Sequence, residues 1–252
     1  MTLRTYLIGN VCLECDGYLV PEKSLPGRQG RVLFAALAWE RAHAVTAEEV
    51  ADIVWDGAPP GSWQVALRSL VSKLRTALAD LPEDVRIEHA FGSYQLRLPA
   101  DAWIDVEAAS AAVHEAEAAM GDGDLEGATG AALVANAIAR RPFLHGEEGE
   151  WAARKQGELQ EIRLRALAVR GRVALMNGDP TGALTDAEII VEADPYRETA
   201  YVLLMSAHAA AGNSARAIAV YERLRARLAD DLGVGPSPTT EAVFLEIVRG
   251  TR

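Results

Sequence analysis

Residues 62–78 read SWQVALRSLVSKLRTAL, and this stretch decides the fold. Its leucine and valine side chains recur with helical spacing at Leu67, Leu70, Val71, Leu74 and Leu78. The spacing predicts an amphipathic helix, capped by Ser62 and running to about Leu81, whose apolar stripe docks on other helices. The polar residues outside or flanking the stripe are Gln64, Arg68, Ser72, Lys73, Arg75 and Thr76. Because no acidic residue occurs from Ser62 to Ala79, we expect a locally basic surface on this helix.

A β-hairpin is predicted directly after this helix. Residues 85–89 and 94–98 alternate apolar and polar side chains, and Phe91-Gly92-Ser93 supplies the turn between them. Upstream, residues 3–15 and 18–25 have strand character on either side of the turn pair Asp16-Gly17. Strands at the start, helices in the middle and a closing hairpin indicate a winged helix-turn-helix.

Two shorter helices are predicted between the first strands and the basic helix. The first follows Pro26-Gly27, shows helical spacing of apolar residues from Val32 onward, and ends near His43. The second opens with a capping box formed by Thr46 and Glu49 and continues through Trp55. Residues 56–61 form a compact turn before the basic helix, which is therefore the third helix and the candidate recognition helix.

DNA binding is the function that this arrangement favours. A helix fits the major groove, which is about 12 Å wide, and its cations and hydroxyls can reach base edges there. The hairpin can reach the DNA backbone or the minor groove. We therefore expect double-stranded promoter DNA as a partner. The alternative is that the charged face of the helix is only solvated.

Length and charge indicate two domains. The chain has 252 residues, half of them apolar, which is enough for two hydrophobic cores, and a charged fraction of 24% is typical of folded chains. The net charge of −11 is unevenly placed. Residues 1–98 hold ten of the 25 Lys and Arg and twelve of the 36 Asp and Glu, net −2, which leaves −9 for residues 99–252. We predict a winged helix domain at 1–98 and an acidic domain at 99–252.

The second half carries a helical repeat. Gly123-Asp124, Gly178-Asp179 and Gly212-Asn213 each lie between Ala- and Leu-rich stretches, and the last two pairs are 34 residues apart, the period of tetratricopeptide helix pairs. Residues 141–149 interrupt the pattern before a long helix that starts near Glu150. Such pairs should stack, and stacked pairs form binding surfaces, although a purely structural role is the alternative. The expected fold class is mainly α with a small β component: a winged helix followed by a tetratricopeptide-like domain.

Enzymatic and metal sites are weakly indicated. Cys12 and Cys15 have C-x-x-C spacing, but they lie on a predicted strand, where residues three apart face opposite sides. His145 precedes three glutamates within residues 147–150, yet glycines break the i, i+4 spacing of hydrolytic zinc helices. No G-x-x-x-x-G-K-[ST] phosphate loop occurs. We expect a protein that is no enzyme and has no cofactor or metal.

Membrane association is not expected either. No apolar run reaches the roughly 18 to 20 residues that span a bilayer, and the N-terminus leads into strand-like sequence rather than a signal peptide. A cytoplasmic location is the corresponding expectation.

Motifs along nearly the whole chain support a family assignment through their order and spacing. In the first half they are PGRQGR at 26–31, WDGAPP at 55–60, LVSKLR at 70–75 and GSYQL at 92–96. In the second half they are DPYRE at 194–198, Ala217-x-x-x-Tyr221-x-x-Leu224, and LADDLGVGPSP at 228–238. Together they resemble the Streptomyces antibiotic regulatory proteins, in which a winged helix of response-regulator type precedes a bacterial transcriptional activator domain.

The resemblance implies a sequence-specific activator of a biosynthetic gene cluster. It places DNA contacts at Arg68, Ser72, Lys73 and Arg75, and we expect Arg28 and Arg31 to add to the basic face. It further implies a homodimer and a contact between the helical domain and RNA polymerase, through a sigma or another subunit.

Three positions depart from the family's pattern. The family commonly has arginine and then asparagine near the start of the third helix, where this chain has Gln64 and Val65, and a wing arginine where this chain has Ala90. Fewer cations mean fewer phosphate contacts and a weaker salt dependence. Two possibilities stay open: DNA binding that depends on dimerisation or a partner, and a degenerate winged helix that serves protein contacts and does not bind DNA by itself.

Overall fold

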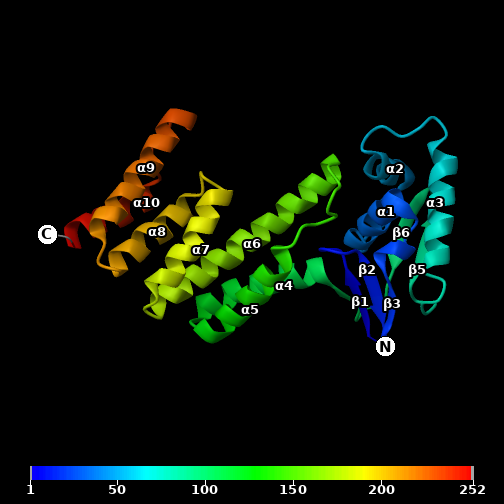
Figure 1. The fold of residues 1–252 in the computed structure, drawn as a ribbon, viewed down its shortest axis with the longest axis horizontal. Coiled ribbons are helices and arrows are strands. Elements are labelled where there is room, and N and C mark those ends of the chain that lie inside the picture. Colours follow the sequence, from blue (N-terminus) through cyan, green and yellow to red (C-terminus); the bar gives the residue numbers. More distant parts are fainter. Residues whose placement is uncertain (1, 251–252) are drawn as a thin grey trace. The chain divides into compact units, whose positions relative to one another are not determined.

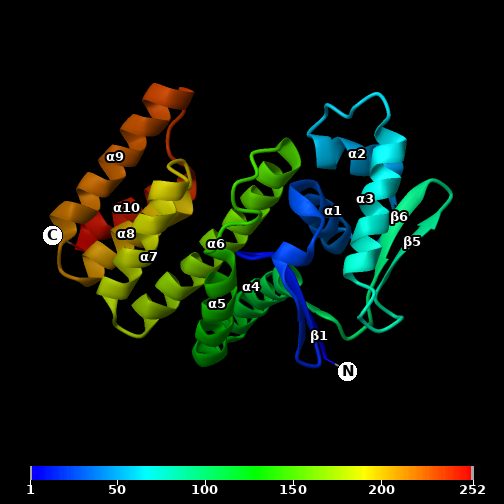
Figure 2. The same cartoon turned by 45° about the vertical axis from the view of Figure 1, so that its right-hand side comes forward.

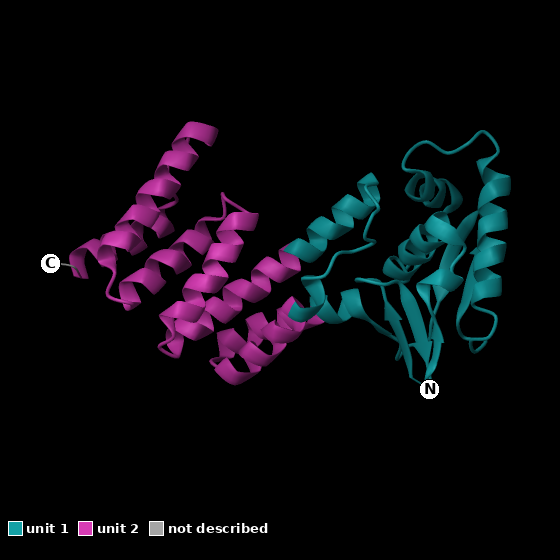
Figure 3. Cartoon of the chain, viewed as in Figure 1, with its two compact units in different colours: residues 1–110, 137–160 teal, residues 111–136, 161–252 magenta. Residues whose placement is uncertain are grey.

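The computed structural model describes residues 2–250, and its contacts divide the chain into two compact units (Figures 1 and 3). Unit 1 contains residues 1–110 and 137–160, and unit 2 contains residues 111–136 and 161–252. Unit 1 has the strands, helices and hairpin of a winged helix, and unit 2 is built from helix pairs. The predicted fold class is therefore confirmed.

A four-stranded sheet opens unit 1. It has the order β3-β2-β1-β7 and consists of β1 Leu3–Tyr6, β2 Cys12–Cys15, β3 Tyr18–Val20 and β7 Trp103–Ile104. The β2–β3 turn is Asp16-Gly17, as predicted, and both residues have positive φ, 47° and 86°. β1 pairs antiparallel with β2 and parallel with β7.

The continuous strand predicted over residues 3–15 is wrong, because the chain leaves the sheet between β1 and β2. The backbone N–H groups of Leu7 and Ile8 donate to the carboxylate of Asp105 at 2.9–3.0 Å instead of to a strand. The strand predicted over 18–25 is also shorter than expected. It ends at Val20 and is followed by the 3-10 turn η1 Glu22–Ser24.

Three helices follow: α1 Gly27–Trp39, α2 Ala47–Trp55 and α3 Trp63–Ala77. Every residue of α1 from Val32 to Ala38 is buried, which makes α1 the central helix of the unit. The capping box at the start of α2 is confirmed, with the Thr46 hydroxyl accepting from the Glu49 amide. The predicted stripe is buried at all five positions: Leu67, Leu70, Val71, Leu74 and Leu78. Helix α3 is shorter than predicted, because it ends at Ala77 with Leu78 as its C-cap and does not reach Leu81.

The hairpin after α3 is confirmed. It consists of β5 Arg86–Ala90 and β6 Ser93–Arg97, and β4 Val45–Thr46 adds a third strand in the order β4-β6-β5 (Figure 2). Ala90 pairs with Ser93, so that Phe91 and Gly92 alone form the turn. Ser93 therefore belongs to the strand rather than to the turn.

Helix pairs build unit 2, and the predicted turns at Gly123, Gly178 and Gly212 are confirmed, each glycine having positive φ. Three helices belong partly to unit 1 and partly to unit 2: α4 Asp105–Asp122, α5 Leu125–Ala139 and α6 Glu150–Met176. The helices wholly within unit 2 are α7 Pro180–Ala193, α8 Glu198–Ala210, α9 Ser214–Leu232 and α10 Pro238–Gly250. Small residues allow close approach: a Cβ on Gly171 of α6 would lie 2.5 Å from Cδ2 of Leu203 on α8. In residues 2–250 no helix combines the length and apolarity that crossing a membrane requires.

Residues 137–160 fold with unit 1 although they lie beyond α4 in the sequence. Phe143 and Trp151 pack their rings on Trp39 of α1 with centroid distances of 5.1 and 6.5 Å. The amide of Gly9 donates to the carbonyl of Pro142 at 2.8 Å. The long helix starts at Glu150, as predicted. Each compact unit contains two separate segments of the chain. The predicted domain boundary at residue 98 stays a prediction.

Candidate nucleic-acid interface

The outer face of α3 brings most of the predicted DNA-contacting residues together. Burial of the apolar stripe against the rest of unit 1 turns the opposite face of the helix to solvent. All six candidates on this helix are exposed: Gln64, Arg68, Ser72, Lys73, Arg75 and Thr76. The sequence adds no carboxylate to this surface, because α3 contains no Asp or Glu.

Arg68 and Lys73 are the cations of α3 that the protein leaves to solvent. In the part of the chain that the structure describes, neither takes part in the ion pairs of unit 1. Their positive charges are therefore not neutralised by neighbouring carboxylates. Such a surface can attract a phosphate backbone, while the hydroxyls of Ser72 and Thr76 offer further hydrogen bonds. The Thr76 hydroxyl at present donates to the Ser72 carbonyl at 3.1 Å.

Arg75 lies on the same helix but has a protein partner. Its Nε and Nη2 donate to the Ile87 carbonyl of β5 at 3.2 and 2.7 Å. These bonds fasten the C-terminal half of α3 to the hairpin. The structure thus gives Arg75 a positioning role between the two elements, and its predicted contact with DNA stays a prediction.

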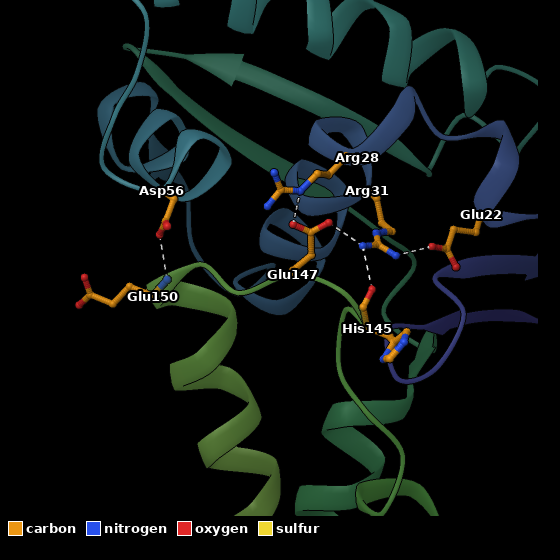
Figure 4. A network of polar contacts seen from close by, with 7 residues as sticks. All are labelled: Glu22, Arg28, Arg31, Asp56, His145, Glu147 and Glu150. Atoms are coloured by element: carbon orange, nitrogen blue, oxygen red, sulfur yellow. Dashed lines mark hydrogen bonds and ion pairs between the residues drawn. The ribbon is translucent and has the colours of Figure 1, made fainter.

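Arg28 and Arg31 are placed in a different cluster, at the start of α1 (Figure 4). Arg28 Nε and Arg31 Nη2 each lie 2.6 Å from an oxygen of Glu147, whose side chain is 5% exposed. Arg31 Nη1 also lies 2.7 Å from Glu22, and Arg31 Nη2 donates to the His145 carbonyl at 3.1 Å. The structure does not bring these two arginines into contact with the candidates on α3.

Electrostatics explain why this cluster is stable. Burial alone would lower the pKa of Arg31, but hydrogen bonds and charge attraction from Glu22 and Glu147 outweigh burial and raise it. Both guanidinium groups serve to hold the loop at residues 141–149 on α1. A DNA phosphate would have to displace Glu147 to reach Arg31. The contribution of Arg28 and Arg31 to DNA binding therefore stays a prediction, and these ion pairs do not support it.

The hairpin has little free positive charge. Glu88 lies between Arg86 and Arg97, with N–O distances of 2.7 Å to each guanidinium. Hydrogen bonds from Arg97 and then Arg86 lower the pKa of Glu88, so this carboxylate stays ionised and offsets one of the two cations.

Phe91 is a candidate contact residue that the sequence reasoning missed. It forms the hairpin tip, it is fully exposed at 106%, and its φ is +50°, a backbone conformation that bulky residues rarely adopt. Val65, on α3, is another large apolar residue that faces solvent. Two-residue turns usually have Asn or Asp before glycine, because the first turn residue must adopt a positive φ. The Phe91-Gly92 pair between two predicted strands was therefore an unusual turn that could have identified Phe91 from the sequence.

The candidate metal and redox residues have other surroundings. In residues 2–250 no group of three or more His, Cys, Asp and Glu side chains is arranged to hold a metal ion. Glu147 binds Arg28 and Arg31, and the backbone N–H of Glu150 donates to Asp56 at 2.8 Å (Figure 4). Cys12 and Cys15 are free thiols, and burial raises the pKa of each.

Comparison with known proteins gives one family model and several relatives. The model of the bacterial transcriptional activator domain matches residues 104–248. The regulatory protein AfsR of Streptomyces coelicolor is 33% identical over 98% of this chain, and the regulatory protein DnrI of Streptomyces peucetius is 24% identical over 88%. The transcriptional regulatory protein EmbR of Mycobacterium tuberculosis is 26% identical over 96% of this chain.

The chain spans 24% of AfsR, 62% of EmbR and 84% of DnrI. A solved structure of Mycobacterium tuberculosis EmbR, in complex with a low-affinity phosphopeptide, superposes with a TM-score of 0.83 at 26% identity. The superposition covers 98% of this chain and 65% of that chain. All three relatives are named as regulatory proteins, and EmbR is named as a regulator of transcription. The likeness to the EmbR structure extends over both units.

Proposed function

Because the chain belongs to the bacterial transcriptional activator domain family, of the Streptomyces antibiotic regulatory protein type, we propose that it regulates transcription by binding promoter DNA through α3. The observation that carries the proposal is the exposed outer face of α3, which offers the hydroxyls of Ser72 and Thr76, has no carboxylate and has two cations without an ion pair among the described residues. Arg68, Lys73, Ser72 and Thr76 supply phosphate and base-edge contacts. In this proposal Gln64, which is exposed one turn before Arg68, reads bases near the start of the helix.

The match to the bacterial transcriptional activator domain supports an activator, and we propose that its target is a biosynthetic gene cluster. In this proposal the helical unit contacts RNA polymerase or a second copy of the chain, and a homodimer places two α3 helices on two half-sites. Each copy of the winged helix has few free cations. Dimerisation compensates for this, because linking two DNA-binding units raises the overall affinity even though each unit makes the same contacts.

Fluorescence anisotropy with labelled duplex DNA over a series of salt concentrations tests DNA binding by α3. For Arg68→Ala/Lys73→Ala we expect weaker binding and a salt slope reduced by about two, since each phosphate contact contributes about one. The matched control is Lys23→Ala/Arg225→Ala, which removes the same charge from positions outside α3 and should keep the slope. Equal slopes for the wild type and the α3 variant would show that α3 is not the DNA-binding element.

A winged helix that serves protein contacts only is the second candidate function. Exposed Val65, together with the Arg86–Glu88–Arg97 cluster, in which Glu88 offsets one of the two cations, favours it. The same titration separates the two: a chain with this function shows no duplex binding even at low salt.

A further inference from the structure

A groove with a volume of about 410 Å³ lies in unit 2 and is lined by residues of α7, α8, α9 and the α7–α8 loop. Figures 1 and 2 show these three helices next to one another. Its size is within the range of about 300–1,000 Å³ that ligand sites occupy. The lining residues are Glu188, Val191, Glu192, Pro195, Leu204, Arg223 and Arg227. We call it the α7–α9 groove.

The two walls of the α7–α9 groove carry opposite charge. Arg223 and Arg227 are one turn apart on α9, and Glu188 and Glu192 are one turn apart on α7. Like charges at this spacing destabilise a helix, so each wall is unfavourable in the free protein. Yet in the described part of unit 2 none of these four side chains takes part in an ion pair. The walls are therefore left with charge that a ligand can neutralise.

A buried tyrosine fixes the cationic wall. Tyr201 of α8 is fully buried, and its hydroxyl donates to the Pro195 carbonyl at 3.0 Å. The same hydroxyl accepts from Arg227 Nη1 at 3.0 Å, while the Arg223 guanidinium lies 5.7 Å from the ring centroid. Both guanidinium groups are thus positioned by a neutral side chain, which orients them without cancelling their charge. Preorganised arginines of this kind suit a carboxylate, which they can bind with two parallel hydrogen bonds.

The rest of the groove restricts what the ligand can be. Val191, Pro195 and Leu204 supply apolar surface between the walls. The glutamates on α7 repel a polyanion such as nucleic acid, and a ligand without positive charge would leave them unpaired. A polypeptide segment can present an acidic, an apolar and a basic side chain within a few residues.

We propose that the α7–α9 groove binds a short peptide segment of another protein, with an acidic side chain toward α9, an apolar side chain on Leu204 and a basic side chain toward α7. The site goes beyond the proposed DNA binding and does not depend on it, because all of its residues belong to unit 2.

Selection of random short peptides displayed on phage, with the full chain as the target, tests this proposal. We expect selected peptides to share an acidic residue next to an apolar one. Arg223→Ala/Arg227→Ala should bind them about tenfold more weakly or worse, the effect of losing one charge-assisted hydrogen bond. The matched control is Arg225→Ala on the same helix, whose guanidinium pairs with Glu222 and which should bind like the wild type.

Arg223→Ala alone keeps the test decisive if the double variant folds poorly, as circular dichroism would reveal, because it leaves the bond from Arg227 to Tyr201 in place and should still weaken peptide binding. Arg223→Glu/Arg227→Glu should select peptides with a basic residue in place of the acidic one. Peptides without a shared acidic residue, or equal affinity for wild type and the α9 variants, would overturn the proposal. So would sedimentation showing that a self-association of the wild type is lost in the α9 variants, because a second copy would then fill the groove.

Discussion

Phe91, at the tip of the β5–β6 hairpin, has a strained backbone conformation. Phe91 has φ of +50° and a fully exposed ring, so neither backbone preference nor packing explains its presence. Left-handed backbone costs a residue with a Cβ about 1–2 kcal/mol, and Asn tolerates it better. Strained exposed residues of this kind are candidates for ligand contact, and apolar side chains do enter DNA minor grooves.

Phe91→Asn should therefore raise stability while it weakens duplex binding. Asn-Gly is the preferred pair for a two-residue turn with both φ values positive, and we expect a gain of about 1 kcal/mol in the free energy of unfolding. Urea denaturation and anisotropy measure the two effects. Phe91→Ala is the control, because it removes the ring without relieving the backbone, and it should weaken DNA binding without the gain. Unchanged affinity in both variants would exclude a DNA contact by the ring.

A buried histidine makes unit 2 sensitive to acid. His208 is 9% exposed, its Nδ1 has no hydrogen-bond partner in the described residues, and burial, together with Arg216 and Arg223, lowers its pKa against the opposing effect of Glu188. The unfolded chain, with a pKa near the ordinary 6.5, then binds a proton more readily than the folded chain. The free energy of unfolding should fall as the pH decreases through about 6.5.

Melting temperatures of wild type and His208→Gln at several pH values from about 5.5 to 7.5 check this sign. We expect the wild type to lose stability toward the acidic end and the variant to lose less. A steeper loss in the variant would contradict the direction assigned to the pKa of His208.

At the scale of elements, α3 and the hairpin act as one body because Arg75 connects them. Arg75→Met keeps the alkyl stem and removes both bonds to the Ile87 carbonyl. We expect a loss of about 1–3 kcal/mol in the free energy of unfolding, the usual effect of hydrogen bonds to a charged group. Arg68→Met, on the same helix but without a protein partner, should stay within about 0.5 kcal/mol of the wild type. Urea denaturation measures both effects. Equal losses in the free energy of unfolding for Arg75→Met and Arg68→Met would show that the bonds from Arg75 to the hairpin do not stabilise the fold.

These elements also show what local sequence can reveal. The stripe on α3, the capping box of α2 and the hairpin were predictable, because each depends on residues a few positions apart. The break between β1 and β2 was not, because its cause is Asp105, whose carboxylate accepts from Leu7 and Ile8 almost a hundred residues away. Likewise, the positions of Arg75 and Arg31 were visible in the sequence, but their partners Ile87 and Glu147 were not.

At the scale of the whole molecule, the winged helix is completed by residues 137–160, from the end of α5 to the first part of α6. The sequence predicted the interruption at 141–149 and the helix start near Glu150, but not that this segment packs on Trp39. An aromatic contact of Phe143 and Trp151 with a helix a hundred residues earlier leaves no periodic signature. Unit 1 is therefore discontinuous, with residues 137–160 sharing its core.

Phe143→Ala should destabilise unit 1 by about 3–5 kcal/mol, the usual range for a buried phenylalanine. Hydrogen exchange of the α1 amides should accelerate, while the amides of α9 keep their protection. Phe244→Ala, whose ring stacks on Tyr221 at 3.9 Å in unit 2, should show the reverse pattern. Unchanged exchange in α1 after loss of Phe143 would mean that the winged helix is stable without this segment.

Sequence-specific DNA binding by α3 is the proposal on which the function of the whole molecule depends. Repeated selection from a random duplex library at fixed salt, with the full chain as the target, tests it most directly. The wild type should enrich a shared sequence, and Arg68→Ala/Lys73→Ala should enrich none, while Lys23→Ala/Arg225→Ala enriches the wild-type sequence. Enrichment of the same sequence by the α3 variant, or of no sequence by the wild type, would contradict the claim.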